Sequence, residues 1–236
     1  MTMNKITLLS IAILSSFFIT SCDDEVDLPP VLEIFDGYYI QGDATPYDGL
    51  DNNGLMIDGN AEGQATKYLN LKSGSITVTR EKNSTTENPN STTFGLNGEG
   101  EFVEGGNAIA CTQTPGYYFF RSDVEAKSID YVAINSWGVI GSATPGGWGE
   151  DTDMALVSSD NGVYVYSVDV ELKGGEWLKF RANDQWAPQF GVKDGKFALR
   201  LYESEDDPGS IKVEETGLYT VKMTLGAAFE YELIKK

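Results

Sequence analysis

Histidine is absent from the 236-residue chain. Histidine is the commonest general base and a frequent zinc ligand, so its absence leaves only Asp and Glu chemistry as a catalytic option and oxygen-ligated calcium as a metal option. A glycosidase would need one carboxyl group in an apolar setting that raises its pKa. The 36 Asp and Glu residues stand mainly in runs that we expect to be solvated, such as residues 203–207. We therefore predict that the protein is not an enzyme.

Positive charge is also scarce, because 17 Lys and Arg face 36 Asp and Glu and the formal net charge is −19. Nucleic acids and anionic membrane surfaces would repel such a chain. We therefore expect no nucleic-acid partner.

Cysteine occurs twice, at Cys22 and Cys111. Cys22 follows the residues Ile-Thr-Ser, an order that resembles the bacterial lipobox, in which the cysteine becomes the lipidated first residue of the mature protein. A lipidated Cys22 leaves Cys111 without a disulfide partner. The apolar neighbours of Cys111 predict a small buried side chain.

Long apolar runs are absent apart from residues 6–19, a segment of 14 residues that is too short to span a bilayer comfortably. With Lys5 before it, this segment predicts a lipoprotein signal peptide over residues 1–21. Residues 22–32 are predicted to form an acidic, proline-containing tether, and Asp23–Asp27 resembles the acidic tag of surface-exposed lipoproteins. We expect a lipid anchor in the outer membrane, facing the cell exterior. The alternatives are an ordinary export signal and a merely solvated tether.

From residue 33 onward, alternating apolar and polar residues are separated by clusters of Gly, Asn, Asp and Pro. This pattern predicts short β-strands, for example over residues 163–172, 218–225 and 229–234, and no stretch has the helical period. Regularly spaced short strands of this kind are typical of β-sandwiches. We therefore predict an all-β fold.

The sequence also repeats itself at a spacing of 96 to 101 residues. The matching segments are Gly42–Pro46 with Gly141–Pro145, Leu71–Gly74 with Leu172–Gly175, and Phe94–Leu96 with Phe190–Val192. Because these segments recur in one order, we predict two tandem β-sandwich domains over residues 33–134 and 135–236, divided near Ile134–Asn135.

One tryptophan stands in a loop rather than in a strand pattern. Trp148 lies between two glycines, follows the Gly- and Pro-rich segment 141–147 and precedes several acidic residues, which predicts an exposed indole. The first copy has Gly49 at this place, although Tyr47 offers a weak substitute. We therefore expect the ligand site in the second domain, with the first domain as a degenerate repeat or a spacer.

The loop Gly141–Trp148 and the segment Leu178–Trp186, followed by Phe190-Gly191, resemble the SusE/SusF family, which are surface starch-binding lipoproteins of Bacteroidetes. The C-terminal β-sandwiches of that family are similar to carbohydrate-binding modules, in which an aromatic pair and a basic or amide side chain hold the sugar. The resemblance implies that Trp148 and Trp186 form the aromatic pair and that Arg200 is the basic residue.

Strand alternation supports part of this assignment. It places Arg200 on the outer face of its strand, and it places Trp177, Lys179 and Arg181 together on one face of theirs. These three residues form either a ladder on the outer face or one flank of the groove. Arg200 could instead be a solvated strand residue, Trp186 could pack on its own sandwich, and Trp137 is expected to be structural. The predicted glycan-binding residues are Trp148, Trp186, Arg200, Lys179, Arg181 and Asn183.

These observations predict a non-catalytic surface protein that binds starch or maltooligosaccharides beside a SusC/SusD-like uptake system, without a cofactor or a metal. Two indoles set at an angle would follow a coiled α-1,4-glucan. The alternatives are a different glycan or a structural role beside an importer. The Asn- and Asp-rich residues 48–58 lack the spacing of an EF-hand loop, and a solvated turn is favoured over a calcium site.

Overall fold

The structure is a computed structural model and describes residues 34–49, 52–59, 61–85 and 88–236. The described residues belong to one compact unit. The predicted signal peptide, the tether and the lipidation site at Cys22 lie outside the described residues.

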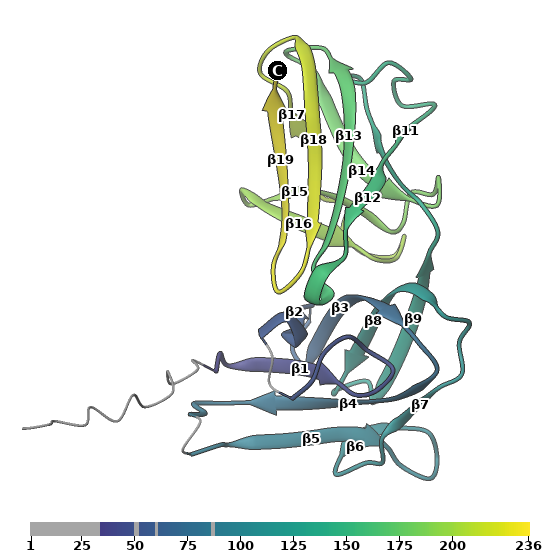
Figure 1. The fold of residues 1–236 in the computed structure, drawn as a ribbon, viewed down its shortest axis with the longest axis vertical. Coiled ribbons are helices and arrows are strands. Elements are labelled where there is room, and N and C mark those ends of the chain that lie inside the picture. The colour runs from purple at the N-terminus through teal and green to yellow at the C-terminus, as the bar shows by residue number, and fades with distance from the viewer. Residues whose placement is uncertain (1–33, 50–51, 60, 86–87) are drawn as a thin grey trace, which may run out of the picture. The chain divides into compact units, whose positions relative to one another are not determined.

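The first half of the described chain forms a five-stranded and a four-stranded antiparallel sheet (Figure 1). The five-stranded sheet contains β1 (Gly37–Gln41), β4 (Gly74–Glu81), β5 (Ser91–Leu96), β6 (Phe102–Glu104) and β7 (Ile109–Cys111). The four-stranded sheet contains β2 (Ile57–Asp58), β3 (Gln64–Leu71), β8 (Gly116–Asp123) and β9 (Ser128–Ile134). A short 3-10 turn, η1, spans Asn52–Gly54.

The second half forms a six-stranded and a four-stranded sheet. The six-stranded sheet contains β10 (Trp137–Ile140), β11 (Thr152–Asp153), β14 (Trp177–Ala182), β15 (Gln189–Lys193), β16 (Lys196–Arg200) and β17 (Ile211–Lys212). The four-stranded sheet contains β12 (Ala155–Ser158), β13 (Tyr164–Leu172), β18 (Gly217–Leu225) and β19 (Phe229–Lys235), and a second 3-10 turn, η2, spans Asp160–Gly162.

The prediction of an all-β fold with β-sandwich domains is confirmed. Strand β18 shows why the alternation is informative, because Tyr219, Val221, Met223 and Leu225 are buried while the residues between them are at least partly exposed. Among the described residues, no helix has the length and apolar character needed to cross a membrane.

The two sandwiches share one strand topology. The order β1-β4-β5-β6, with β7 beside β4, corresponds to β10-β14-β15-β16, with β17 beside β14. The order β2-β3-β8-β9 corresponds to β12-β13-β18-β19, and β11 is added beside β10 in the second sandwich. Each sheet therefore takes its strands from one side of the segment between β9 and β10. The two domain ranges themselves remain a prediction.

The repeated Gly-x-Ala-Thr segment makes the same hydrogen bonds in both sandwiches. Ala44 N donates to Ser75 O at 3.2 Å, as Ala143 N donates to Trp177 O at 3.0 Å. Lys72 N donates to Ala44 O, as Lys173 N donates to Ala143 O, both at 2.9 Å. Within the segment, Thr45 Oγ1 donates to Gly42 O at 3.0 Å, as Thr144 Oγ1 donates to Gly141 O at 2.9 Å. These bonds fasten the loop after β1 or β10 to the neighbouring strand. The repetition in the sequence thus reflects a repeated backbone contact.

A second matched feature lies at the start of β8 and β18. The hydroxyl of Tyr118 donates to the carbonyl of Thr114, and the hydroxyl of Tyr219 donates to the carbonyl of Glu215, both at 2.8 Å. A tyrosine that bonds back to the backbone a few residues upstream is a known corner device of β-sandwiches. It fixes the chain where it enters the strand.

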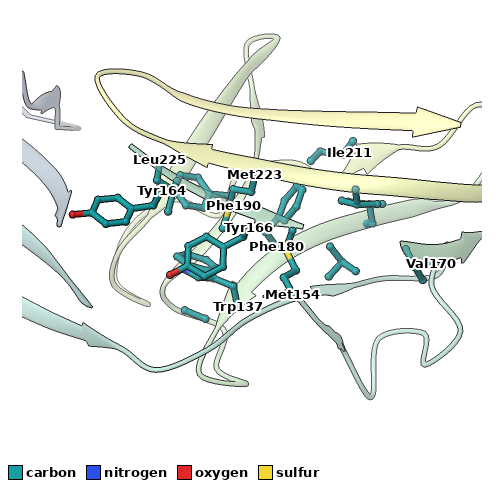
Figure 2. Close-up of a cluster of buried hydrophobic side chains, with 14 of the residues drawn as sticks. Trp137, Met154, Tyr164, Tyr166, Val170, Phe180, Phe190, Ile211, Met223 and Leu225 are labelled. Atoms are coloured by element: carbon teal, nitrogen blue, oxygen red, sulfur yellow. The ribbon is translucent and has the colours of Figure 1, made fainter. Parts of the chain in front are cut away.

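The core of the second sandwich is rich in aromatic residues. Trp137, Tyr166, Phe180 and Phe190 are buried between its sheets, as Figure 2 shows. The Trp137 and Phe190 rings have centroids 5.6 Å apart. Trp137 is therefore a structural residue, as the sequence predicted.

Tyr47 corrects one sequence expectation. Its ring is buried, and its hydroxyl donates to the carbonyl of Gly162 at 2.9 Å. A buried ring cannot offer a stacking face to a ligand, so Tyr47 is not a substitute for the exposed indole of the second sandwich.

We predict that Gly141→Ala destabilises the protein by more than about 1 kcal/mol, because Gly141 has a φ of +148° and a Cβ there would lie 2.1 Å from the carbonyl oxygen of Trp177. Urea unfolding monitored by tryptophan fluorescence measures the change. The matched control is Gly149→Ala, where the added Cβ would meet only the Gly146 carbonyl at 3.7 Å, and it should stay within about 0.5 kcal/mol of wild type. Equal stability of the two variants would contradict the role assigned to Gly141.

Candidate functional site

Two exposed tryptophans lie beside each other on the second sandwich. The ring centroids of Trp148 and Trp186 are 6.3 Å apart and the ring planes are inclined by 40°. Trp148 is 42% exposed and Trp186 is 41% exposed, so neither ring belongs to the core. Together they form one apolar surface with a bend, which we call the tryptophan pair. The prediction that both indoles are exposed and oblique to each other is confirmed.

The loop between β10 and β11 presents Trp148. Gly141 N donates to Gly147 O at 3.0 Å and Gly147 N donates to Thr144 O at 3.2 Å, so the loop closes on itself just before the tryptophan. Gly147 has a φ of +60°, a left-handed conformation that glycine adopts without strain. The closed turn explains why the indole points away from the sandwich rather than into it.

The connection between β14 and β15 carries Trp186 and is fastened by Asn183. The Asn183 side chain donates from Nδ2 to the Ala133 carbonyl at 2.9 Å and accepts at Oδ1 from the Asn135 amide at 2.7 Å. Asn183 therefore ties this loop to the segment between β9 and β10. Its side-chain amide thus holds the backbone, while its role as a direct glycan ligand stays a prediction.

Arg181 packs against the Trp186 ring of the tryptophan pair. Its guanidinium carbon lies 5.2 Å from the centroid of the Trp186 ring, and its Nε and Nη2 donate to Asp151 Oδ2 and Oδ1 at 3.0 and 2.9 Å. The side chains of Arg181 and Asp151 are only 9% and 7% exposed. Two of its donors thus bind Asp151 and its face contacts Trp186, while its role as a sugar ligand stays a prediction.

The sheet leaves room for this ion pair at Gly138. Gly138 is the cross-strand neighbour of Arg181, and a Cβ there would lie 2.5 Å from Asp151 Oδ2. A side chain at this position would therefore displace the Asp151 carboxylate. Asp151 follows Trp148 by three residues in the same loop, so the ion pair connects this loop to β14, and the Trp186 ring contacts the same arginine.

The charges around the ion pair shift three pKa values. The Arg181 guanidinium, through its hydrogen bonds, lowers the pKa of Asp151, and Asp151 in turn raises the pKa of Arg181. Asp184 lies close to Asp151, and repulsion between the two carboxylates raises the pKa of Asp184. Asp151 is thus the carboxylate that stays ionised as the pH falls.

Lys179 has a structural partner as well. Its Nζ donates to Asp207 Oδ1 at 2.5 Å, and Gln189 Nε2 donates to the same oxygen at 2.7 Å. The Lys179 side chain is only 7% exposed. Its ammonium group fastens the loop that carries Asp207 to the sheet, while its role as a glycan ligand stays a prediction.

Arg200 lies on the same face of the sheet as Arg181, two strands away through Gln189. Its Nε donates to the Glu205 carbonyl at 3.0 Å, and its Nη2 donates to the Glu203 carbonyl. The structure therefore does not bring the Arg200 guanidinium to the tryptophan pair. It holds the acidic loop that follows β16.

The acidic loop over residues 203–207 is less solvated than the sequence suggested. Glu205 forms an ion pair with Arg121, and Asp207 binds Lys179. No sequence motif marks these partners. The only available signal was that a lysine and an arginine at alternating strand positions need counter-charges if a loop covers that face.

The polar groups nearest in sequence to the two indoles are Glu150, Asp184 and Gln185, and all three residues are exposed. Carboxylates and amides accept hydrogen bonds from hydroxyl groups, and an amide also donates. The two loops thus carry exposed hydrogen-bond acceptors close in sequence to the apolar indoles. Within the described part of the chain, no cluster of three His, Cys, Asp or Glu residues is arranged to hold a metal ion.

A cavity of about 860 Å³ lies apart from the tryptophan pair and includes Phe197, Tyr231, Lys196 and Glu230 in its lining. Its charged side chains are of both signs, so its chemistry does not select one class of ligand. We therefore take the tryptophan pair as the candidate site.

The chain matches no protein-family model and no curated protein sequence.

We predict that Asp151→Asn destabilises the protein by about 3 kcal/mol near neutral pH, since it leaves the buried Arg181 charge without its partner. The pKa of Asp151 is lowered in the folded state, so its stabilising effect is complete above about pH 5 and is lost as the pH falls below its ordinary value of 3.8. Guanidinium unfolding at pH 7 and at pH 3 measures both effects. Asp184→Asn is the matched control and should not lower stability at pH 7. A similar loss in both variants would contradict the assignment.

Proposed function

We propose that the protein is a non-catalytic glycan-binding protein, whose tryptophan pair binds starch or maltooligosaccharides. The observation that carries this proposal is the exposure of two adjacent indoles, inclined by 40°, on loops that internal hydrogen bonds hold in place. Large aromatic side chains are rarely left exposed together on a monomeric protein unless they contact something.

An indole face suits one side of a sugar ring. The C–H groups of a pyranose form an apolar face, while its hydroxyl groups form a polar rim. Covering that face with Trp148 or Trp186 removes apolar surface of both partners from water. The rim then meets the exposed side chains of Glu150, Asp184 and Gln185, which can bond to hydroxyl groups.

The inclination of the two rings favours a curved chain. Two coplanar rings would match the flat face of a cellulose-like polymer, whereas rings inclined by 40° match a chain that turns between one unit and the next. Starch and maltooligosaccharides curve in this way because of their α-1,4 linkages. This agrees with the resemblance of the loop around Trp148 to the SusE/SusF family.

Charge favours a neutral glycan over an acidic one. The formal net charge of the chain is −19, and Asp151, Asp153 and Asp184 lie around the tryptophan pair. Polysaccharides that carry carboxylates or sulfates would be repelled. Neutral α-glucans meet no such barrier.

Rigid support under the site reduces the entropy lost on binding. Arg181, Asp151 and Asn183 hold the two loops before any ligand arrives, so fewer side chains become ordered in the complex.

Two stacked rings and a few hydrogen bonds correspond to a Kd between micromolar and millimolar, or roughly −8 to −4 kcal/mol. Such weak sites act together when many copies are tethered to one surface. We propose that a lipid anchor at Cys22 provides this tether, beside an outer-membrane uptake system.

We predict that the protein migrates more slowly in native gels that contain amylopectin, and that Trp148→Ala and Trp186→Ala each remove most of this retardation. Both rings are exposed, so both variants should keep the unfolding midpoint of wild type within a few degrees. Phe35→Ala is the matched control, because Phe35 is an exposed aromatic residue far from Trp148 in the sequence.

The same gels cast with dextran, xylan or pullulan separate the alternatives. Retardation in xylan or dextran alone would replace the starch proposal by another glycan. Unchanged mobility in every gel would reject glycan binding and favour a structural role beside an importer.

A further inference from the structure

A third exposed tryptophan lies on the same side of the sheet as the support of the tryptophan pair. Trp177 begins β14, is 44% exposed, and precedes Arg181 by four residues. Residues at even spacing on a strand face the same side, so Trp177 shares the outer face with Arg181. Four residues of strand span about 13 Å, so the backbone of Trp177 lies about that far along β14 from the backbone of Arg181.

The first sandwich provides an internal comparison. Ser75 and Trp177 occupy equivalent places, because each accepts a hydrogen bond from the alanine of the Gly-x-Ala-Thr segment. Thr79 and Arg181 are equivalent through their cross-strand partners on β1 and β10. The outer face of β4 therefore carries small polar residues at the positions where β14 carries Trp177 and Arg181.

This comparison connects Trp177 with the binding site rather than with the fold. Both sandwiches keep the same strand order and the same loop hydrogen bonds, so the fold does not require a tryptophan at this position. The sandwich that has the tryptophan pair also has Trp177, whereas its copy has Gly49 in place of Trp148 and Ser75 in place of Trp177.

The surface between the two ends of β14 is polar. Lys179 lies midway and is covered by Asp207, whose side chain is 58% exposed. An exposed carboxylate between two aromatic positions can accept hydrogen bonds from the hydroxyl groups of an intervening sugar. Trp177 at one end of β14, the Asp207 carboxylate over its middle and the tryptophan pair near Arg181 thus suit an unbranched ligand that follows the direction of β14.

We propose that Trp177 is an additional stacking position for a distant unit of the same glycan, so that the site binds a chain of several sugar units along β14. This inference rests on the proposed function, and it specifies the length and direction of the ligand. A short oligosaccharide fills only the tryptophan pair, whereas a longer one also reaches Trp177.

Isothermal titration calorimetry with maltotriose and maltoheptaose tests the inference on wild type, Trp177→Ala and Trp148→Ala. We expect Trp177→Ala to weaken maltoheptaose binding about fivefold to tenfold and to leave maltotriose binding unchanged, while Trp148→Ala weakens both. Leu218→Ala is the matched control, because Leu218 is an exposed apolar residue at the start of β18. Unchanged thermal unfolding of Trp177→Ala shows that any effect is not a loss of fold.

The outcomes distinguish the two proposals. If Trp177→Ala binds both sugars like wild type while Trp148→Ala loses both, the inference about Trp177 is overturned and the proposed function stands. An equal loss for both sugars in Trp177→Ala also overturns it, since Trp177 would then belong to the short-ligand site. If wild type binds neither sugar, both proposals fail.

Discussion

The ion pair between Arg181 and Asp151 is the contact on which the tryptophan pair depends. Burying two charges is unfavourable unless the geometry of the pair is good, and here two hydrogen bonds of 3.0 and 2.9 Å join the guanidinium to the carboxylate. Asp151 belongs to the loop that carries Trp148, and the free face of the guanidinium lies under Trp186. One arginine therefore fixes both indoles. Gly138 makes the arrangement possible, because any side chain there would occupy the space of the Asp151 carboxylate.

The same principle extends over the outer face of the sheet. Positive charge is scarce in this chain, yet Lys179, Arg181 and Arg200 all point to one face of β14 and β16. Each holds a loop: Arg181 binds Asp151, Lys179 binds Asp207, and Arg200 binds two carbonyls of the acidic loop. Acidic segments that looked merely solvated are therefore part of the framework. The exposed indole faces and the acceptors beside them suit the neutral, hydroxyl-rich partner that we propose.

These contacts also explain which features the sequence could predict. Strand alternation and glycine-rich turns are local, so the strands of the second half and the exposure of Trp148 followed from neighbouring residues. The partners of Lys179 and Arg181 lie 28 and 30 residues away along the chain, and Asn183 bonds to Asn135 across 48 residues. Alternation assigns a side chain to a face, but it does not show which loop folds over that face. The sequence therefore placed Lys179 and Arg181 on one face of the strand but did not identify the protein groups that they bind.

The two sandwiches show how one framework accepts different surfaces. The Gly-x-Ala-Thr segment and the tyrosine corner form backbone contacts in both copies, and these contacts restrict their residues tightly. Outer-face positions carry no such restriction, so Thr79 of one copy can correspond to Arg181 of the other. The loop after the first strand diverges most. In the first sandwich its aromatic residue, Tyr47, is buried and bonds to Gly162, whereas in the second sandwich its aromatic residue, Trp148, is exposed. The same loop thus serves packing in one copy and presents an indole in the other, so only the second sandwich carries an exposed aromatic ring in this loop.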